Sequence, residues 1–193
     1  MTPGTPPSGK SLLLKVFLPI GVILLLVFSA LTLVKSRAHL GSGSVGTAQI
    51  KEGAVLNDFD LSKFKGQSAP MSSLPGKVFL INFWASWCEA CMVEMPSIVK
   101  LWNEFHGQGF EVLAVNVDEN PDAVIPALSN KLHMEFPIFI DKDQALGNLF
   151  DVRAIPMSLI IDHNRKILFI DTGERDWSSS EVREQLKQWL AKT

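Results

Sequence analysis

The stretch "INFWASWCEACMVEMP", residues 81–96, contains Cys88 and Cys91, the only two cysteines in the chain. A pair with this spacing can act as a redox-active dithiol, supply half of a metal site, or be buried and inert. A zinc site usually needs four cysteine or histidine ligands, but no second cysteine pair exists and the four histidines are scattered singly. Covalent haem attachment needs a histidine directly after the second cysteine, where Met92 stands. The favoured interpretation is therefore redox chemistry.

The segments around the cysteines predict how the two thiols are positioned. The continuous apolar run "VFLINFW", residues 78–84, is typical of a strand buried on both faces. Residues 92–106 place apolar side chains at helical spacing. Cys88 should then lie at or just before a helix N-terminus, where open backbone N–H groups and the helix dipole stabilise a thiolate. Cys91 should lie one turn later, inside the helix and shielded.

This asymmetry predicts different tasks for the two thiols. The Cys88 thiolate is expected to attack a disulfide in a partner, and Cys91 then attacks the Cys88 sulfur to release the reduced partner. Glu94 follows Cys91 by three residues on the same helix face. If its carboxyl is buried under the strand end, its pKa is raised, and it can serve as the general acid or base. Glu89 is expected to be exposed and to oppose thiolate formation at Cys88.

Two other hypotheses remain open for the cysteine pair. Two thiolates together with the thioethers of Met92 and Met95 are the soft ligands that Cu(I) prefers, so a copper-delivery module is the alternative function. Packing of both methionines in a core is the simpler interpretation. A catalytically idle interaction domain is the third hypothesis, and it predicts that the cysteine pair is dispensable.

The start of the chain predicts a membrane anchor. Residues 16–34, "VFLPIGVILLLVFSALTLV", carry no charge, and their length suits a bilayer core of about 30 Å. We expect a short cytoplasmic segment at 1–15, a transmembrane signal-anchor at 16–34, a flexible tether at 35–51 and a folded domain at 52–193. A cleaved signal peptide is the alternative, although the apolar core of such peptides is usually shorter.

Charge and composition exclude several classes of function. Four of the 18 Lys and Arg residues lie in 1–38, which has no acidic residue. The remainder of the chain therefore has 14 basic and 20 acidic residues, a net charge of −6. An acidic domain of this kind is a poor candidate for binding nucleic acid. The chain has no NAD or flavin motif, so we expect no cofactor beyond a redox-active disulfide. We also expect a monomer.

The remaining pattern alternates strands with helices. Besides the segments above, strands are expected at 55–64, 110–118 and 136–141, helices at 122–133, 144–150 and 178–192, and an antiparallel hairpin at 157–162 and 166–171. Ser178 and Glu181 have the spacing of a capping box for the last helix. The predicted fold class is a three-layer α/β domain with a mostly parallel sheet and an antiparallel edge.

Several motifs in this order resemble the thioredoxin superfamily. The similarity is closest to its membrane-anchored, extracytoplasmic branch, the TlpA/ResA/CcmG-like (DsbE-like) thiol:disulfide oxidoreductases. It covers most of residues 52–193 and rests on "GKVFLINFWASWC", "VEMP", "EVLAVNVDENPDAV" and "AIPMSLIID". The resemblance implies a thioredoxin-like three-layer fold with a mixed central sheet. Glu94 matches the acidic residue of this branch, whereas Asn82 stands where cytoplasmic thioredoxins have a buried aspartate.

The resemblance also implies roles for individual residues. Cys88 matches the attacking cysteine, Cys91 the resolving cysteine, and Pro156 the cis-proline that faces the disulfide. The substrate is then expected to contact four positions around the disulfide, the last of them through its backbone: Trp87, Glu89, Ala90 and Ile155. The chain departs from many relatives at Ala90, where they have proline, and at Met157, where threonine is frequent.

The implied activity is the reduction of disulfides in exported proteins. Apocytochrome c and a copper-site protein are the candidate substrates, and a membrane electron donor would re-reduce the cysteine pair. A tethered oxidase would use the same residues, so the direction of electron flow is an expectation from the branch. The implied location is the outer side of a bacterial cytoplasmic membrane, facing the periplasm or the cell exterior.

Overall fold

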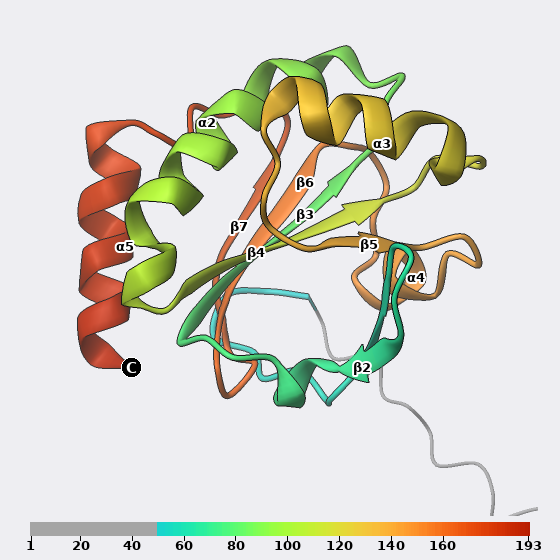
Figure 1. The fold of residues 1–193 in the computed structure, drawn as a ribbon. Helices are drawn as coiled ribbons and strands as arrows, with labels where there is room; N and C mark the ends of the chain where they lie inside the picture. Colours follow the sequence, from blue (N-terminus) through green and yellow to red (C-terminus); the bar gives the residue numbers. More distant parts are fainter. Residues whose placement is uncertain (1–49) are drawn as a thin grey trace, which may run out of the picture. The chain divides into compact units, whose positions relative to one another are not determined.

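A computed structural model describes residues 50–193 of the chain (Figure 1). The predicted cytoplasmic segment, the anchor at 16–34 and nearly all of the tether therefore lie outside the described residues. Within residues 50–193, no helix is both long enough and apolar enough to cross a membrane.

One mixed sheet of seven strands forms the centre of the domain, in the order β2–β1–β5–β4–β3–β6–β7. Three parallel strands occupy its middle: β3 (Val78–Trp84), β4 (Phe110–Asn116) and β5 (Ile138–Ile140). Antiparallel strands extend it on both sides: β6 (Met157–Asp162), β7 (Ile167–Thr172), β1 (Asp60–Lys63) and β2 (Ser68–Pro70). The predicted α/β class, mixed sheet and C-terminal hairpin are confirmed. The expectation of a mostly parallel sheet was wrong, because only the β3–β4 and β4–β5 pairs are parallel and antiparallel strands form both edges.

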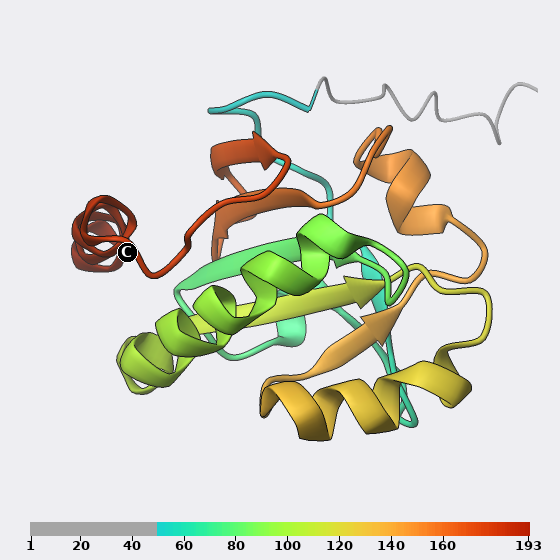
Figure 2. The ribbon, with the colours of Figure 1, turned by 90° about the horizontal axis from the view of Figure 1, so that it is seen from above.

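Helices cover both faces of this sheet, as the two views show (Figures 1 and 2). One face packs against α2 (Glu89–Phe105), α3 (Pro121–Leu132) and α5 (Ser180–Lys192), and the other against α4 (Ala145–Leu149) and the segment before β3. Alternate β3 residues divide between the two cores because strand side chains point to opposite faces. Val78, Leu80 and Trp84 join the α2 side. Asn82 points to the same face as these three residues and is the one polar residue of this strand.

Two predicted boundaries were wrong. The strand expected at 55–64 is limited to Asp60–Lys63, with only an isolated bridge at Val55, because Asp58 instead accepts hydrogen bonds from the backbone and hydroxyl of Ser72. The last helix is capped by Ser179, whose Oγ accepts the Val182 N–H. Ser178, the predicted cap, donates through its N–H and hydroxyl to Asp176. Strand β2 and a short 3₁₀ turn at Met71–Ser73 were not predicted.

Candidate functional site

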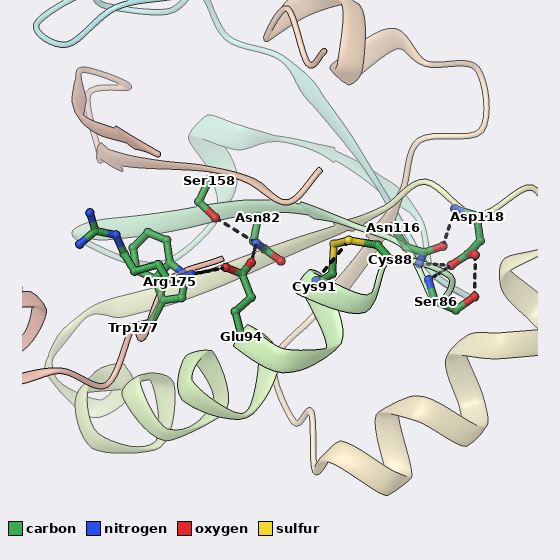
Figure 3. The surroundings of a disulfide bond; sticks show 10 residues. All are labelled: Asn82, Ser86, Cys88, Cys91, Glu94, Asn116, Asp118, Ser158, Arg175 and Trp177. Atoms are coloured by element: carbon green, nitrogen blue, oxygen red, sulfur yellow. Dashed lines mark hydrogen bonds between the residues drawn. A yellow bond between two sulfur atoms is a disulfide. The ribbon is translucent and has the colours of Figure 1, made fainter. Parts of the chain in front are cut away.

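The two cysteines form a disulfide at the point where β3 passes into α2 (Figure 3). Cys88 is the N-cap residue of α2, and its Sγ accepts the Cys91 backbone N–H at 3.2 Å. The Cys88 side of the bond is 7% exposed, whereas Cys91 is fully buried. Because a helix N-terminus stabilises negative charge, this position favours a thiolate at Cys88 once the bond is reduced. The predicted asymmetry of exposure is confirmed.

A cluster of polar groups holds the loop that carries Cys88. The Asp118 carboxylate accepts the backbone N–H of Ser86 at 2.9 Å and its hydroxyl at 2.8 Å. Asn116 donates to the same carboxylate at 2.7 Å. Since β3 and β4 are parallel, their carboxyl ends lie side by side, which places these residues next to the loop. The sequence interpretation missed this cluster, although an aspartate at the end of a predicted strand was a signal for it.

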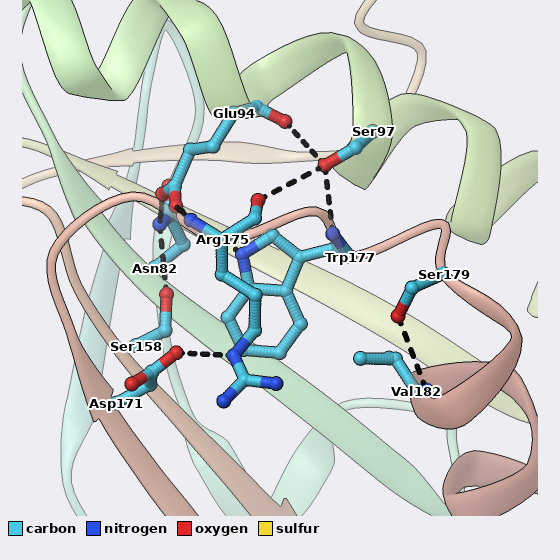
Figure 4. A network of polar contacts seen from close by, with 9 residues as sticks. All are labelled: Asn82, Glu94, Ser97, Ser158, Asp171, Arg175, Trp177, Ser179 and Val182. Atoms are coloured by element: carbon cyan, nitrogen blue, oxygen red, sulfur yellow. Dashed lines mark hydrogen bonds and ion pairs between the residues drawn. The ribbon is translucent and has the colours of Figure 1, made fainter.

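Glu94 lies one turn after Cys91 with its carboxyl buried, 2% exposed, and Asn82 on β3 faces it (Figure 3). Its Oε1 accepts from Asn82 Nδ2 at 2.7 Å. Its Oε2 accepts at 3.3 Å from both the Trp177 indole N–H and the Arg175 backbone N–H (Figure 4). Burial raises the pKa of Glu94, and these three donors oppose the rise. The predicted burial and the predicted direction of the pKa shift are confirmed.

Asn82 connects Glu94 to the neighbouring strand. The same Nδ2 that donates to Glu94 also donates to Ser158 Oγ on β6 at 2.9 Å. Its Oδ1 is buried and has no hydrogen-bond partner among the described residues. The Asn82 amide therefore holds the Glu94 carboxylate through Nδ2, while its Oδ1 accepts no hydrogen bond from the described residues and lies beside the redox pair (Figure 3).

The peptide bond between Ile155 and Pro156 is cis. Pro156 directly precedes β6, and the pairing of Phe83 with Met157 brings it to the end of β3 from which the cysteine loop extends. No hydrogen bond to the Ile155 backbone occurs within residues 50–193. This backbone is therefore free to pair with an extended segment of another chain.

The other predicted contact residues lie on the surface around the disulfide. Trp87 is 70% exposed, Glu89 is exposed as expected, and Ala90 is half-buried. Trp87 and Ile155 line a groove of about 500 Å³, together with Val117, Val152 and several polar residues that include Glu119 and Lys142. The groove therefore includes two of the predicted substrate contacts, one next to Cys88 in sequence and one next to cis-Pro156.

The two methionines considered as copper ligands differ in burial. Met95 is fully buried in the core cluster on the α2 face, and Met92 is half-buried against the same cluster. A side chain packed in this way contributes to the core, which agrees with the simpler interpretation of Met95.

Comparisons with known proteins agree with this geometry. The AhpC/TSA family model matches residues 53–170. The thiol-disulfide oxidoreductase ResA of Geobacillus thermodenitrificans is 34% identical over 138 residues, covering 72% of this chain and 75% of that protein. ResA of Bacillus subtilis is 30% identical over 159 residues, covering 82% of this chain and 86% of that protein.

Solved structures share the fold. A protein of Chlorobium tepidum assigned as thiol:disulfide interchange protein DsbE superposes with a TM-score of 0.66 at 27% identity, covering 74% of this chain and 99% of that one. StoA of Bacillus subtilis has a TM-score of 0.55 at 22% identity, covering 70% and 97%, which supports the fold alone. The chain therefore belongs to the AhpC/TSA family and is a thioredoxin-like thiol:disulfide oxidoreductase of the ResA and DsbE type.

Proposed function

We propose that this protein reduces disulfides in exported proteins, with Cys88 as the attacking and Cys91 as the resolving cysteine. The arrangement of the pair carries the exchange chemistry, and the reducing direction is the one expected of the extracytoplasmic branch that the chain resembles. Cys88, which retains 7% exposure, caps helix α2, and Cys91 is fully buried one turn before a buried carboxyl. The Cys88 sulfur, the more accessible of the two, is the one placed to meet a partner disulfide, and the Cys91 sulfur can reach only Cys88.

The reaction then proceeds in two exchange steps. The Cys88 thiolate attacks one sulfur of the partner disulfide, a mixed disulfide forms, and the released partner thiolate takes up a proton. Cys91 next loses its proton, and its thiolate attacks Cys88 Sγ. The second partner sulfur leaves and is protonated, and Cys88 and Cys91 end as the disulfide of this structure. Two electrons have passed to the partner.

In this scheme, Glu94 accepts the proton that Cys91 must lose. A carboxylate with an ordinary pKa is a weak base toward a thiol, and burial brings the pKa of Glu94 closer to that of its partner. Each turnover leaves the pair oxidised, so an electron donor has to reduce it again. The chain has no NAD or flavin motif, which supports a donor protein in the membrane.

The location and the partners follow from the same proposal. An anchor at 16–34 would hold the domain on the outer side of a bacterial cytoplasmic membrane, where disulfides persist. The candidate substrates are apocytochrome c and a copper-site protein, each presenting a cysteine pair. Cis-Pro156 and the Ile155 backbone would position the substrate strand, and Trp87, Glu89 and Ala90 would contact it.

The test is disulfide reduction by purified full-length protein, with insulin as substrate and dithiothreitol as reductant. Cys88→Ser should abolish catalysis, and Cys91→Ala should accumulate a mixed disulfide at Cys88. Full activity of Cys88→Ser would overturn the mechanism. Glu94→Gln should remove one ionisation from the pH profile of exchange, and an unaltered profile would remove Glu94 from the scheme. Stoichiometric Cu(I) binding without reductase activity would instead favour the copper-delivery module.

A further inference from the structure

The segment between β7 and α5, residues 173–179, forms one wall around Glu94, although it is remote in sequence. Trp177 is separated from Glu94 by 83 positions, yet its indole N–H donates to Glu94 Oε2. The Arg175 backbone N–H donates to the same oxygen. The redox reaction as described uses neither residue.

Trp177 is held firmly in this position. Its side chain is 1% exposed, and its backbone N–H donates to Ser97 Oγ on α2 at 2.9 Å (Figure 4). The indole packs edge-on against Phe169, with ring centroids 6.5 Å apart, and the Arg175 guanidinium lies 5.8 Å from its centroid. A ring enclosed in this way presents its N–H in one direction, toward the carboxylate.

The other charged groups near Glu94 come from several elements. The Arg175 guanidinium is paired with Asp171 on β7, so this arginine reaches Glu94 only through its backbone. A hollow of about 370 Å³ also reaches Glu94 from the side of α2, and its lining includes Lys100, Glu174 and Asp176. The redox cysteines at the start of α2 are the remaining titratable groups near Glu94. Strands β3 and β6 contribute only the neutral side chains of Asn82 and Ser158.

We propose that Trp177 is a positioning residue for proton transfer, fixing Glu94 Oε2 through its indole N–H so that the carboxylate is held ready for the Cys91 proton. This inference rests on the proton-accepting role proposed for Glu94. Asn82 holds one carboxylate oxygen, and Trp177 together with the Arg175 N–H holds the other, so rotation of the carboxylate would break these hydrogen bonds. The indole also favours the ionised form because an N–H donor binds a carboxylate more strongly than a carboxylic acid.

The test uses Trp177→Phe, which keeps an aromatic ring and removes the N–H. Full-length protein labelled with ¹³C at glutamate carboxyls is titrated by NMR in the oxidised state, and Glu94→Gln identifies the Glu94 signal. Trp177→Phe should raise the proton affinity of Glu94 about tenfold, as expected for one charge-assisted hydrogen bond. The pH profile of insulin reduction should move to higher pH in parallel.

Trp84→Phe is the matched control. Trp84 is fully buried on the same face of the sheet, and its Nε1 has no partner among residues 50–193. This variant loses comparable packing, so its Glu94 titration should match that of the wild type. If Trp177→Phe is unstable, Ser97→Ala loosens the same wall, because Ser97 Oγ accepts the Trp177 N–H and donates to the Arg175 and Glu94 carbonyls. It should move the titration in the same direction.

The outcomes separate this inference from the proposed function. A pH profile changed by Glu94→Gln but not by Trp177→Phe, with an unshifted Glu94 titration, would overturn the role of Trp177 alone. A pH profile unaltered by Glu94→Gln would overturn the role of Glu94 itself. Equal shifts in Trp177→Phe and Trp84→Phe would show that lost packing, and not the indole N–H, is responsible.

Discussion

Asn82→Asp would place a second carboxyl against Glu94 with little change in side-chain volume. The Asn82 Nδ2 atom that it replaces lies 2.7 Å from Glu94 Oε1, in a site where both residues are buried. Two negative charges about 3 Å apart repel by about 5 kcal/mol at an effective dielectric constant of about 20. One carboxyl of the pair should therefore stay protonated near neutral pH, and the two should titrate as a coupled pair.

The sign of the effect on stability follows from proton binding. In the unfolded chain both carboxyls ionise near pH 4, whereas the folded pair retains one proton. The folded state then binds more protons than the unfolded state, so the free energy of unfolding falls as pH rises. At about 1.4 kcal/mol per pH unit, the variant should lose about 3 kcal/mol between pH 5 and pH 7.5. In the wild type, the raised pKa of Glu94 also makes the free energy of unfolding fall as pH rises. This fall is confined to the pH range between the pKa of Glu94 in the unfolded and in the folded state.

The assay is urea unfolding of the oxidised full-length protein at several pH values, since the disulfide prevents titration of the cysteines. Asn82→Leu is the control, because it removes the amide without adding a carboxyl. It also removes a donor that opposes the rise of the Glu94 pKa, so its stability should depend on pH somewhat more than that of the wild type. The dependence should still be weaker than in Asn82→Asp, because Asn82→Leu has one carboxyl and not a coupled pair. If Asn82→Asp and Asn82→Leu gave parallel stability curves, Glu94 would not lie in the enclosed site described, and the reasoning about its proton affinity would be refuted.

Three further substitutions test other parts of the site. Trp87→Ala should slow insulin reduction several-fold while changing unfolding free energy by less than about 0.5 kcal/mol, because the ring is 70% exposed; equal slowing with a small disulfide would contradict a docking role. Asp118→Ala should cost about 2 kcal/mol in urea unfolding, since the Ser86 N–H and hydroxyl lose their acceptor, and a neutral effect would contradict this. Met95→Ala should cost about 2–5 kcal/mol by the same measurement as a fully buried core residue, and a small loss would reopen its role as a ligand.

The cysteine end of the site could be predicted from sequence because its geometry is local. A buried strand running into a helix places Cys88 at the cap, and helical spacing puts Cys91 and Glu94 on one face. These relations depend on a few neighbouring residues, so periodicity alone is sufficient to predict them.

The position of the segment 173–179 beside Glu94 depends on tertiary structure. Trp177 appears in the sequence as a lone tryptophan in the polar run "GERDWSSS", and nothing in that run indicates which helix it meets. Its position is set by the β6–β7 hairpin, which returns the chain to the α2 face of the sheet. The predicted cap of α5 was wrong for a different, local reason: the Asp176 carboxylate, two residues earlier, accepts both hydrogen bonds that Ser178 donates.

The central claim, that the Cys88–Cys91 pair donates electrons to partner disulfides, is tested most directly by its reduction potential. Equilibration of the full-length protein against dithiothreitol buffers, followed by alkylation and mass spectrometry, measures this potential. A reductase should lie near the value of thioredoxin, about −270 mV, and below about −200 mV. A potential near that of the oxidant DsbA, about −120 mV, would contradict the proposed direction of electron flow.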